Sequence, residues 1–489
     1  MIETNFGYIL LLGTLGFFGY IGFQAVSDKE LDSDTYLAAR GTQSWQVIGL
    51  SLFASGMGIW ILFGPSEVGY YGGFWDVVGY ALSASTPFLL LAYVGPMIRD
   101  KLPDGVTLAD YVRSRIGREM QLYVGIISVV YMFTFLFAEF TAIGKAMVIL
   151  TGMNPLIPMV AVAGVTAAYT AYGGLPASIR TDRWQAWIVL WLIIALLLIL
   201  FAADIGSLIA DAKAYNPEDA WSIGSMSYMD SFASGLALVI AITAAEMFSQ
   251  GNWQRAYASK DNEALKKGAL LAAGLVLPLV LVMGILGTVA AGQGALADPS
   301  AAFFSLIVGA SPLLLAAFVV LGVALVCSSA DTLQNAVVAS ITRDIADGKM
   351  KLSHARIATI ALIPVALYLA TGPTIGPLTF DALGVFEIFL FADLLATATV
   401  LPVLLTLWDR VNSKASLAGA ICGLLSVIAY GAFTADISTG LGYIVSPTNE
   451  WGLANLHVFL AALIGSGAVT IGVSLLLDEK QESATDESE

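Results

Sequence analysis

The stretch from Leu321 to Asp344 carries residues whose types could do chemistry. Inside an otherwise apolar run, small and oxygen-bearing residues recur at intervals of three or four, which places them on one side of a helix. Hydroxyl and carboxylate oxygens are hard ligands, and each would cost several kcal/mol in hydrocarbon without a partner. The stripe must therefore face protein, water or a bound cation, and a small hard cation fits it best. Its members are Gly322, Leu325, Ser328, Ser329, Asp331, Thr332, Asn335 and Ala336.

Close packing between membrane helices is the alternative explanation of this stripe, because Ser, Thr and Ala allow backbones to approach closely. That explanation accounts for Ser328 and Ser329, but it leaves Asp331 as a buried acid without a partner. The carboxylate therefore favours a cation site.

The composition excludes several classes of function. Of the 489 residues, 58% are hydrophobic and 12% are charged, and the mean hydropathy is +0.81, which is typical of a protein that crosses a membrane many times. The only cysteines are Cys327 and Cys422, and the only histidines are His354 and His457. These residues support neither a disulfide framework nor a Cys/His metal site, and the sequence offers no catalytic set for an enzyme. The net charge of -15 does not suggest nucleic-acid binding. We expect a lipid bilayer and a small-molecule solute as partners.

Thirteen apolar windows are long enough to cross a bilayer, so the two termini are predicted to lie on opposite sides. With the N-terminus outside, every Lys and Arg except Lys145 and Lys213 falls on the inner side, as the positive-inside rule requires. We expect a multi-pass plasma (cell) membrane protein with a cytoplasmic C-terminus, in which residues 7–26 are a retained first span. The windows are 7–26, 46–70, 73–97, 120–151, 156–173, 184–206, 230–250, 268–292, 311–342, 354–371, 377–408, 415–435 and 456–477.

Two spans are interrupted by glycine and polar residues. The second span carries Ala54–Gly58 near its middle, and the seventh, five spans later, ends in Ser249–Asn252. Paired interruptions are typical of transporters with broken helices, whose free carbonyls coordinate a cation and whose free N–H groups meet the substrate. Glycine tolerance would explain either interruption alone, but together they favour an inverted repeat.

At this point the chain resembles the sodium:solute symporter family, which includes proline, pantothenate, sialic acid, sugar and urea or polyamine carriers. The resemblance implies an all-α membrane protein with the leucine-transporter fold and 13 transmembrane helices. These would be one leading helix, a five-plus-five inverted repeat and two trailing helices. It also implies that the protein is a symporter that works by alternating access and catalyses no chemical reaction. The matching residues are Tyr169–Leu175 with Ala177, Thr181, Asp182 and Gln185; Trp253–Arg255 with Ala258, Lys260 and Asp261; and Ser328 and Ser329 with Thr342 and Asp344.

The domain division follows from that fold. We expect a leading helix with a cytoplasmic loop (1–44), a first five-helix repeat (45–206), an extracellular loop (207–229), a second repeat (230–410), two trailing helices (411–478) and an acidic cytoplasmic tail (479–489).

The resemblance also implies where the coupling ion binds. A sodium ion would be held by the carbonyls of Ala54, Met57 and Leu325 and by the hydroxyls of Ser328 and Ser329. Some members place a further ion nearby, for which the matching residues are Asp182, Asp331 and Thr332. Here Asp331 stands where a serine is common, so two acids share one site, and neighbouring acids in a low dielectric can share one proton. A second cation and a proton both remain open.

Residues beside the two interruptions are expected to line the solute site. Glu246 lies one turn before the second interruption, and its carboxylate favours a small nitrogenous solute such as an amino acid, a urea-like molecule or an amine. Glu139 is also expected at the solute site, although it could instead pair with Lys145. The roles of four further acids stay open: Glu67, Asp381, Glu387 and Asp393. Gly56 stands where proline-type members carry an acid, so their contacts do not transfer. The expected lining residues are Gly56, Trp60, Phe63, Glu139, Glu246, Ser249 and Gln250.

Other functions compete with a sodium-coupled symporter. A proton-coupled symporter of the same fold is one. A solute sensor is disfavoured because about a dozen residues after Leu477 leave no room for a signalling domain. A channel is disfavoured because broken helices around a midplane site suit alternating access better than a continuous pore. The oligomeric state stays open, a monomer included.

Overall fold

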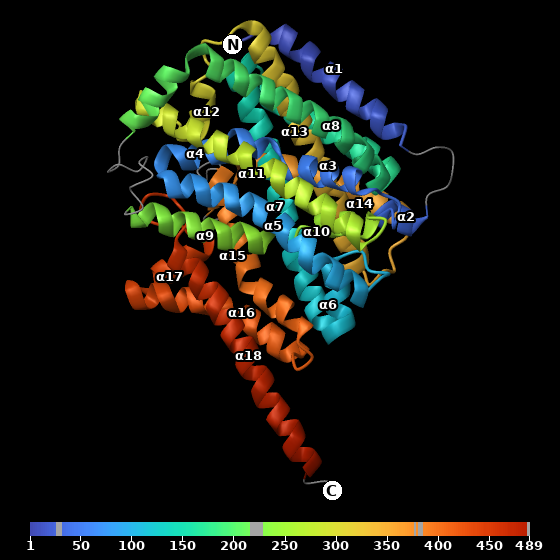
Figure 1. Cartoon of the computed structure of the whole chain (residues 1–489). Helices are drawn as coiled ribbons and strands as arrows, with labels where there is room; N and C mark the ends of the chain where they lie inside the picture. Colours follow the sequence, from blue (N-terminus) through green and yellow to red (C-terminus); the bar gives the residue numbers. More distant parts are fainter. Residues whose placement is uncertain (26–31, 216–227, 376–377, 380–384, 487–489) are drawn as a thin grey trace.

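The fold is a helical bundle with one short hairpin, β1 (Thr374–Ile375) paired with β2 (Leu378–Thr379). The protein is described from a computed structural model that places residues 1–25, 32–215, 228–375, 378–379 and 385–486. Figure 1 shows the helices packed side by side, with the last helix extending away from the bundle. Parts of the predicted loop (216–227) and tail (487–489), and Asp381, lie outside the described residues.

The helices account for nearly all of the described chain. In hydrocarbon an α-helix satisfies its own backbone hydrogen bonds, so long apolar segments take this form. The helices are α1 Thr4–Phe23, α2 Ser33–Ala38, α3 Trp45–Gly56, η1 Ile59–Leu62, α4 Gly64–Tyr71, α5 Phe74–Lys101, α6 Leu108–Ile116, α7 Arg118–Thr151, α8 Leu156–Ala214, α9 Met229–Glu246, α10 Gln250–Ala258, α11 Asn262–Gln293, η2 Pro299–Ala301, α12 Ala302–Ser305, α13 Pro312–Ser340, η3 Ile341–Ile345, α14 Leu352–Ala370, α15 Val385–Leu404, η5 Leu405–Leu407, α16 Ser413–Thr434, α17 Ile437–Val445 and α18 Leu456–Asp486.

The predicted count of thirteen spans is not confirmed. Within the described residues, eleven helices are long and apolar enough to cross a membrane, or twelve when a bent pair counts as one span. The difference lies in α8, which contains both the 156–173 and the 184–206 windows. Gly174 interrupts α8 with a φ of +58° and a ψ of -146°, and a Cβ there would lie 2.5 Å from the Tyr36 carbonyl oxygen. Glycine is therefore required at this bend.

Both predicted interruptions are breaks in the structure. The first separates α3 from η1 and α4, whose axes differ by 57°. The second break covers Met247–Ser249, between α9 and α10, so that of the predicted Ser249–Asn252 only Ser249 lies in it and the rest begin α10. Each break frees backbone groups that need partners inside the protein.

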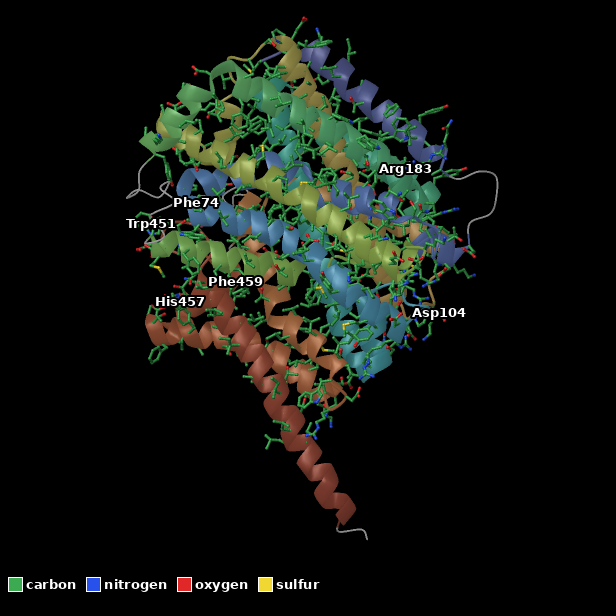
Figure 2. All side chains as sticks on the ribbon, in the orientation of Figure 1. Phe74, Asp104, Arg183, Trp451, His457 and Phe459 are labelled. Carbon is green, nitrogen blue, oxygen red and sulfur yellow. The ribbon has the colours of Figure 1, made fainter. Side chains whose placement is uncertain are left out.

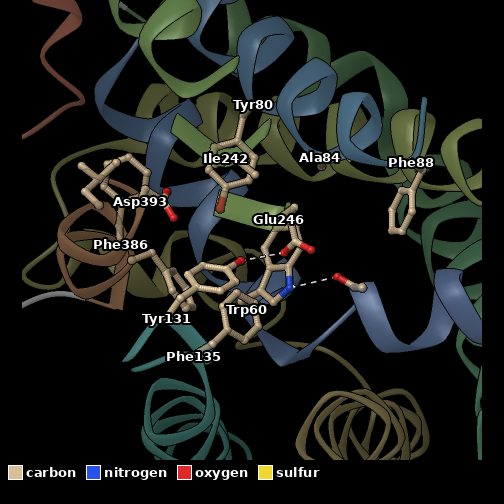
Figure 3. Close-up of a pocket in the computed structure, with 13 residues that line it drawn as sticks. Trp60, Tyr80, Ala84, Phe88, Tyr131, Phe135, Ile242, Glu246, Phe386 and Asp393 are labelled. Carbon is tan, nitrogen blue, oxygen red and sulfur yellow. Dashed lines mark hydrogen bonds between the residues drawn. The ribbon is translucent and has the colours of Figure 1, made fainter. Parts of the chain in front are cut away.

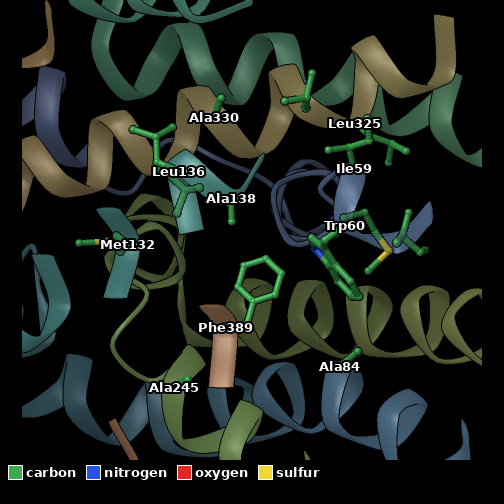
Figure 4. Close-up of a cluster of buried hydrophobic side chains, with 14 of the residues drawn as sticks. Ile59, Trp60, Ala84, Met132, Leu136, Ala138, Ala245, Leu325, Ala330 and Phe389 are labelled. Atoms are coloured by element: carbon green, nitrogen blue, oxygen red, sulfur yellow. The ribbon is translucent and has the colours of Figure 1, made fainter. Parts of the chain in front are cut away.

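Buried side chains of α7, α13 and α15 surround the first break. Figure 4 shows Leu136 and Ala138 of α7, Leu325 of α13 and Phe389 of α15 around the break, which carries Ile59 and Trp60. Close helix contacts hold the flanks: a Cβ on Gly69 would lie 1.9 Å from the Gly284 carbonyl oxygen, and one on Gly79 would lie 2.3 Å from the Gly235 Cα. Packing therefore fixes the position of both broken helices.

Candidate functional site

The end of α3 meets the middle of α13 through oxygen atoms. Ser328 Oγ lies 2.9 Å from the Ala54 carbonyl oxygen and 2.8 Å from that of Leu325, and Ser329 Oγ lies 3.3 Å from the same Leu325 oxygen. Met57, whose N–H bonds back to the Phe53 and Ala54 carbonyls, caps the end of α3. Four of the five expected sodium ligands thus lie together, all of them buried. Hydroxyl and carbonyl oxygens suit a hard cation, so the donor set fits sodium.

Glu139 of α7 caps the first break. Its Oε2 accepts from Ile59 N at 2.9 Å and its Oε1 from Trp60 N at 3.3 Å, which satisfies N–H groups at the start of η1. Ser329 Oγ also donates to Oε2, at 2.6 Å. A Cβ on Gly58 would lie 2.4 Å from this carboxylate, so only glycine admits it. Glu139 therefore links the ion ligands to the break, and its hydrogen bonds are not with Lys145.

A pocket of about 610 Å³, counting the space at its open side, lies between the two breaks. Figure 3 shows aromatic rings of η1, α5, α7 and α15 around it, with Glu246 and Asp393 among them. Trp60 is held in the wall because its Nε1 donates to the Gly56 carbonyl oxygen at 3.2 Å. The lining residues are Gly56, Trp60, Tyr80, Ala84, Phe88, Tyr131, Phe135, Ile242, Glu246, Phe386, Phe389, Leu390 and Asp393.

Two carboxylates give this pocket its charge. Glu246 accepts a hydrogen bond from the Tyr131 hydroxyl at 2.8 Å and one from Asn252 Nδ2 at 2.8 Å. Asp393 is 4% exposed, and its carboxylate has no hydrogen bond or ion pair with any described residue. The described lining residues include no Lys, Arg or His. The pocket is therefore acidic and aromatic at once.

Of the seven residues expected to line the solute site, some line the pocket and the others lie outside its lining. Gly56, Trp60 and Glu246 line the pocket, whereas the other four lie outside its lining. Phe63 packs on Phe304 with ring centroids 5.0 Å apart. Gln250 holds the second break, since its Nε2 donates to Ser128 Oγ at 2.8 Å and its Oε1 accepts from Leu108 N at 2.8 Å. Ser249, Glu139, Phe63 and Gln250 are thus neighbours of the pocket rather than part of its wall.

Several residues that line the pocket were not predicted to do so from the sequence. Asp393 is visible there only as an intramembrane acid, and Tyr80, Tyr131 and Phe135 look like ordinary apolar-span residues. A signal existed for Tyr131, because a hydroxyl in a span needs a partner. Its partner, Glu246, is 115 residues away.

A buried charge cluster joins α3, α8, α10 and α13. Arg255, fully buried on α10, donates through Nη2 to Asp182 Oδ2 and to Thr332 Oγ1, both at 2.6 Å, and through Nε to Ser51 Oγ at 2.7 Å. The structure thus brings Asp182, Asp331 and Thr332 together as expected, and it adds Arg255.

Hydroxyl groups satisfy the second acid of this cluster. Asp331 accepts from Tyr169 and Ser178 at 2.6 Å and from Thr181 at 3.0 Å, whereas Oδ1 of Asp182 is buried without a hydrogen-bond partner. The described residues of this cluster therefore include two acids and one arginine.

The sequence model of the sodium:solute symporter family matches residues 36–423. The chain belongs to this family. It is a secondary transporter rather than an enzyme, in a sodium-coupled family. The spermidine transporter DUR31 of Candida albicans is 29% identical over 97% of this chain and 89% of its own length. The sodium/myo-inositol cotransporter of Bos taurus is 31% identical over 37% of this chain and 24% of its own length.

Solved structures support the fold of the symporter. An outward-open sodium-coupled sialic acid symporter superposes with a TM-score of 0.74 at 15% identity, covering 96% of this chain and 97% of its own. The nucleobase-cation symporter Mhp1 gives 0.60 at 13% identity over 92% of this chain and 96% of its own. The symporter therefore has a leucine-transporter-like fold.

Proposed function

We propose that this symporter uses a sodium gradient to import a small organic cation of the polyamine type. The observation that carries the proposal is the pocket itself, in which Glu246 and Asp393 lie among aromatic rings without a basic residue among the described lining. The likeness to a spermidine transporter over nearly the whole chain points the same way.

The chemistry of the pocket suits ammonium groups. Aromatic faces attract cations, by about 0.5–2 kcal/mol each depending on desolvation, and a carboxylate accepts a charge-assisted N–H hydrogen bond. Asp393, with no partner of its own in the described chain, would meet one ammonium group, and Glu246 a second. An anionic solute would be repelled by both acids.

The residues of the first break link the proposed ion site to the solute pocket. Ala54, Met57, Leu325, Ser328 and Ser329 would hold sodium, which supplies a positive charge between α3 and α13. Ser329 bonds to Glu139, and Glu139 bonds to the N–H of Trp60. Because the Trp60 ring lines the pocket, ordering the serines also orders the solute wall. This coupling favours the solute-accepting conformation.

Proton coupling at the buried charge cluster is a second candidate, favoured by its two acids and one arginine. Asp331→Asn should then remove the pH dependence of uptake and keep its sodium dependence. A changed sodium dependence, non-additive with that of Asp182→Asn, would instead indicate a shared cation site.

The membrane and topology follow from the charge pattern. We place the symporter in the plasma membrane, with the N-terminus outside and the basic end of the bundle in the cytoplasm. Figure 2 shows Arg183 and Asp104 at one end of the bundle and Phe74 and Trp451 at the other.

Uptake of labelled spermidine into proteoliposomes tests the proposal. We expect sodium-stimulated, saturable uptake in the wild type, and a loss of apparent affinity of roughly 10- to 100-fold in Glu246→Gln and in Asp393→Asn. Asp211→Asn, which neutralises a half-buried acid away from the pocket, is the matched control. Strong uptake of a monocarboxylate or a sugar that is independent of both pocket acids would show that the solute class is wrong.

A further inference from the structure

A second concave site lies between α1 and α8, and it shares no residue with the solute pocket. It encloses about 1210 Å³ of empty space, counting its open side. The two helices lie side by side in Figure 1, Phe17 of α1 packs on Trp184 with ring centroids 6.0 Å apart, and Ala25, just after α1, lines the site. Its described lining residues are Ala25, Gln43, Pro176, Ile179, Arg180, Arg183, Trp184 and Trp187.

One face of α8 supplies the chemistry of this groove. Arg180, Arg183, Trp184, Trp187 and Trp191 follow one another at steps of three, one, three and four residues, which places them on one stripe of the helix. The three tryptophans are 51%, 47% and 63% exposed. Trp187 and Trp191 stack with ring centroids 6.4 Å apart. Large apolar rings therefore run from the two arginines along the span.

The arginines bring positive charge, and no acid stands among the described lining residues. Arg180 Nη1 donates to the Gln24 carbonyl oxygen at 2.7 Å, which ties it to the end of α1 and leaves its other N–H groups available. Arg183 has no hydrogen bond or ion pair with any described residue, and the described lining of the groove includes no acid. Guanidinium groups match phosphate geometry. The groove thus presents an anion site at the head of an aromatic stripe.

An aromatic belt at the membrane surface would explain the tryptophans alone. It does not explain why two arginines share a groove beside the end of α1 whose described lining includes no acid. A free phosphate would need the arginines only, whereas the stripe from Arg180 to Trp191 runs about 16 Å along the helix and offers rings to an acyl chain. The arginines lie at the basic, cytoplasmic end of the bundle, where anionic lipids concentrate.

We propose that the groove between α1 and α8 binds an anionic phospholipid of the inner leaflet. Arg180 and Arg183 contact its phosphate, and Trp184, Trp187 and Trp191 contact an acyl chain. This site is independent of the solute carried.

Native mass spectrometry of the purified, delipidated symporter with added phosphatidylglycerol tests the site. The wild type should retain one lipid, and Arg180→Gln/Arg183→Gln should need at least about tenfold more lipid for the same occupancy. Lys101→Gln removes an exposed basic side chain at the same end of the bundle and should bind like the wild type. Equal retention by the double variant and the wild type would overturn the proposal.

Two further arms separate the sources of the anion and guard against misfolding. Phosphatidylcholine should bind at least about tenfold more weakly, and inorganic phosphate at the lipid concentration should not displace phosphatidylglycerol. Equal binding of phosphatidylcholine, or displacement by phosphate, would contradict a lipid site. The single variant Arg183→Gln keeps the Arg180 contact with α1, so it should melt like the wild type and still bind lipid more weakly. Wild-type lipid binding in that folded variant would equally count against the proposal.

Discussion

Two pairs of buried acids in this symporter have opposite surroundings. Asp182 and Asp331 lie among Arg255 and several hydroxyl groups, so most of their charge is met inside the chain. Glu246 and Asp393 lie among aromatic rings, with one tyrosine hydroxyl and one asparagine amide between them. The first arrangement meets most of its charge within the chain, whereas the second leaves Asp393 without a partner among the described residues. The two pairs therefore differ in charge balance, and the proposed solute site rests on that difference.

The exposed ion pairs provide a third reference. Arg113 pairs with Asp347 at the surface, where their side chains are 46% and 27% exposed. Water competes for such a pair, so it contributes little to stability. Removing a partner from the buried pair instead leaves a charge in low dielectric.

The largest effect is expected from Arg255→Gln. This change leaves Asp182 and its neighbour Asp331 buried without a cation, which should cost about 3–5 kcal/mol of stability. Thermal melting of the purified protein would measure it, with Arg113→Gln as the matched loss of an arginine. Similar melting temperatures for the two variants would contradict the role given to the buried cluster.

The hydroxyls of α13 come next. Ser328→Ala combined with Ser329→Ala removes two oxygens that contact Ala54, Leu325 and Glu139. With a loss on the order of 1 kcal/mol or more for each hydroxyl, the sodium concentration for half-maximal uptake should rise at least tenfold, while the protein still inserts. Ser305→Ala, which removes a helix-end hydroxyl away from the site, is the control. An unchanged sodium dependence would show that the ion binds elsewhere.

The multi-span helical bundle and its two broken helices were predictable from long apolar windows and from glycine at the breaks, whereas the leucine-transporter fold was implied by the family resemblance. The oxygen stripe of α13 was visible because a helix period is a local property, but its pairing with Ala54 was implied by the resemblance alone. The predicted count of thirteen spans is not confirmed, because the windows 156–173 and 184–206 both lie in α8, on either side of the kink at Gly174. The roles of Asp393 and Tyr131 could not be assigned for another reason. The sequence marks a buried acid and a buried hydroxyl as groups that need partners, but it does not say which distant helices supply them.

Asp393→Asn should change the stability of the protein in the opposite direction from Arg255→Gln. A neutral amide relieves an unpartnered carboxylate, so the melting temperature without solute should rise, by an amount corresponding to about 1 kcal/mol, while spermidine uptake falls. Asp331→Asn is the contrasting variant, because that acid already accepts four hydroxyl hydrogen bonds and gains nothing from neutralisation. A lower melting temperature for Asp393→Asn would show that the chain itself balances this charge.

The smallest effect is expected at Asp347. Hydrogen bonds from Lys349 and Arg113 lower the pKa of Asp347 from 3.8 to about 2. Because the pKa is lower in the folded protein, the stabilisation is present above about pH 4 and is lost as the pH falls toward 2. Asp347→Asn preserves the backbone, since asparagine tolerates the φ of +58° found there. Melts of the variant and the wild type at pH 6 should differ by little more than replicate scatter, and any difference should shrink below pH 4. A difference as large as that for Arg255→Gln, or one that is undiminished at pH 3, would mean that surface and buried pairs in this symporter are not distinguished by solvent.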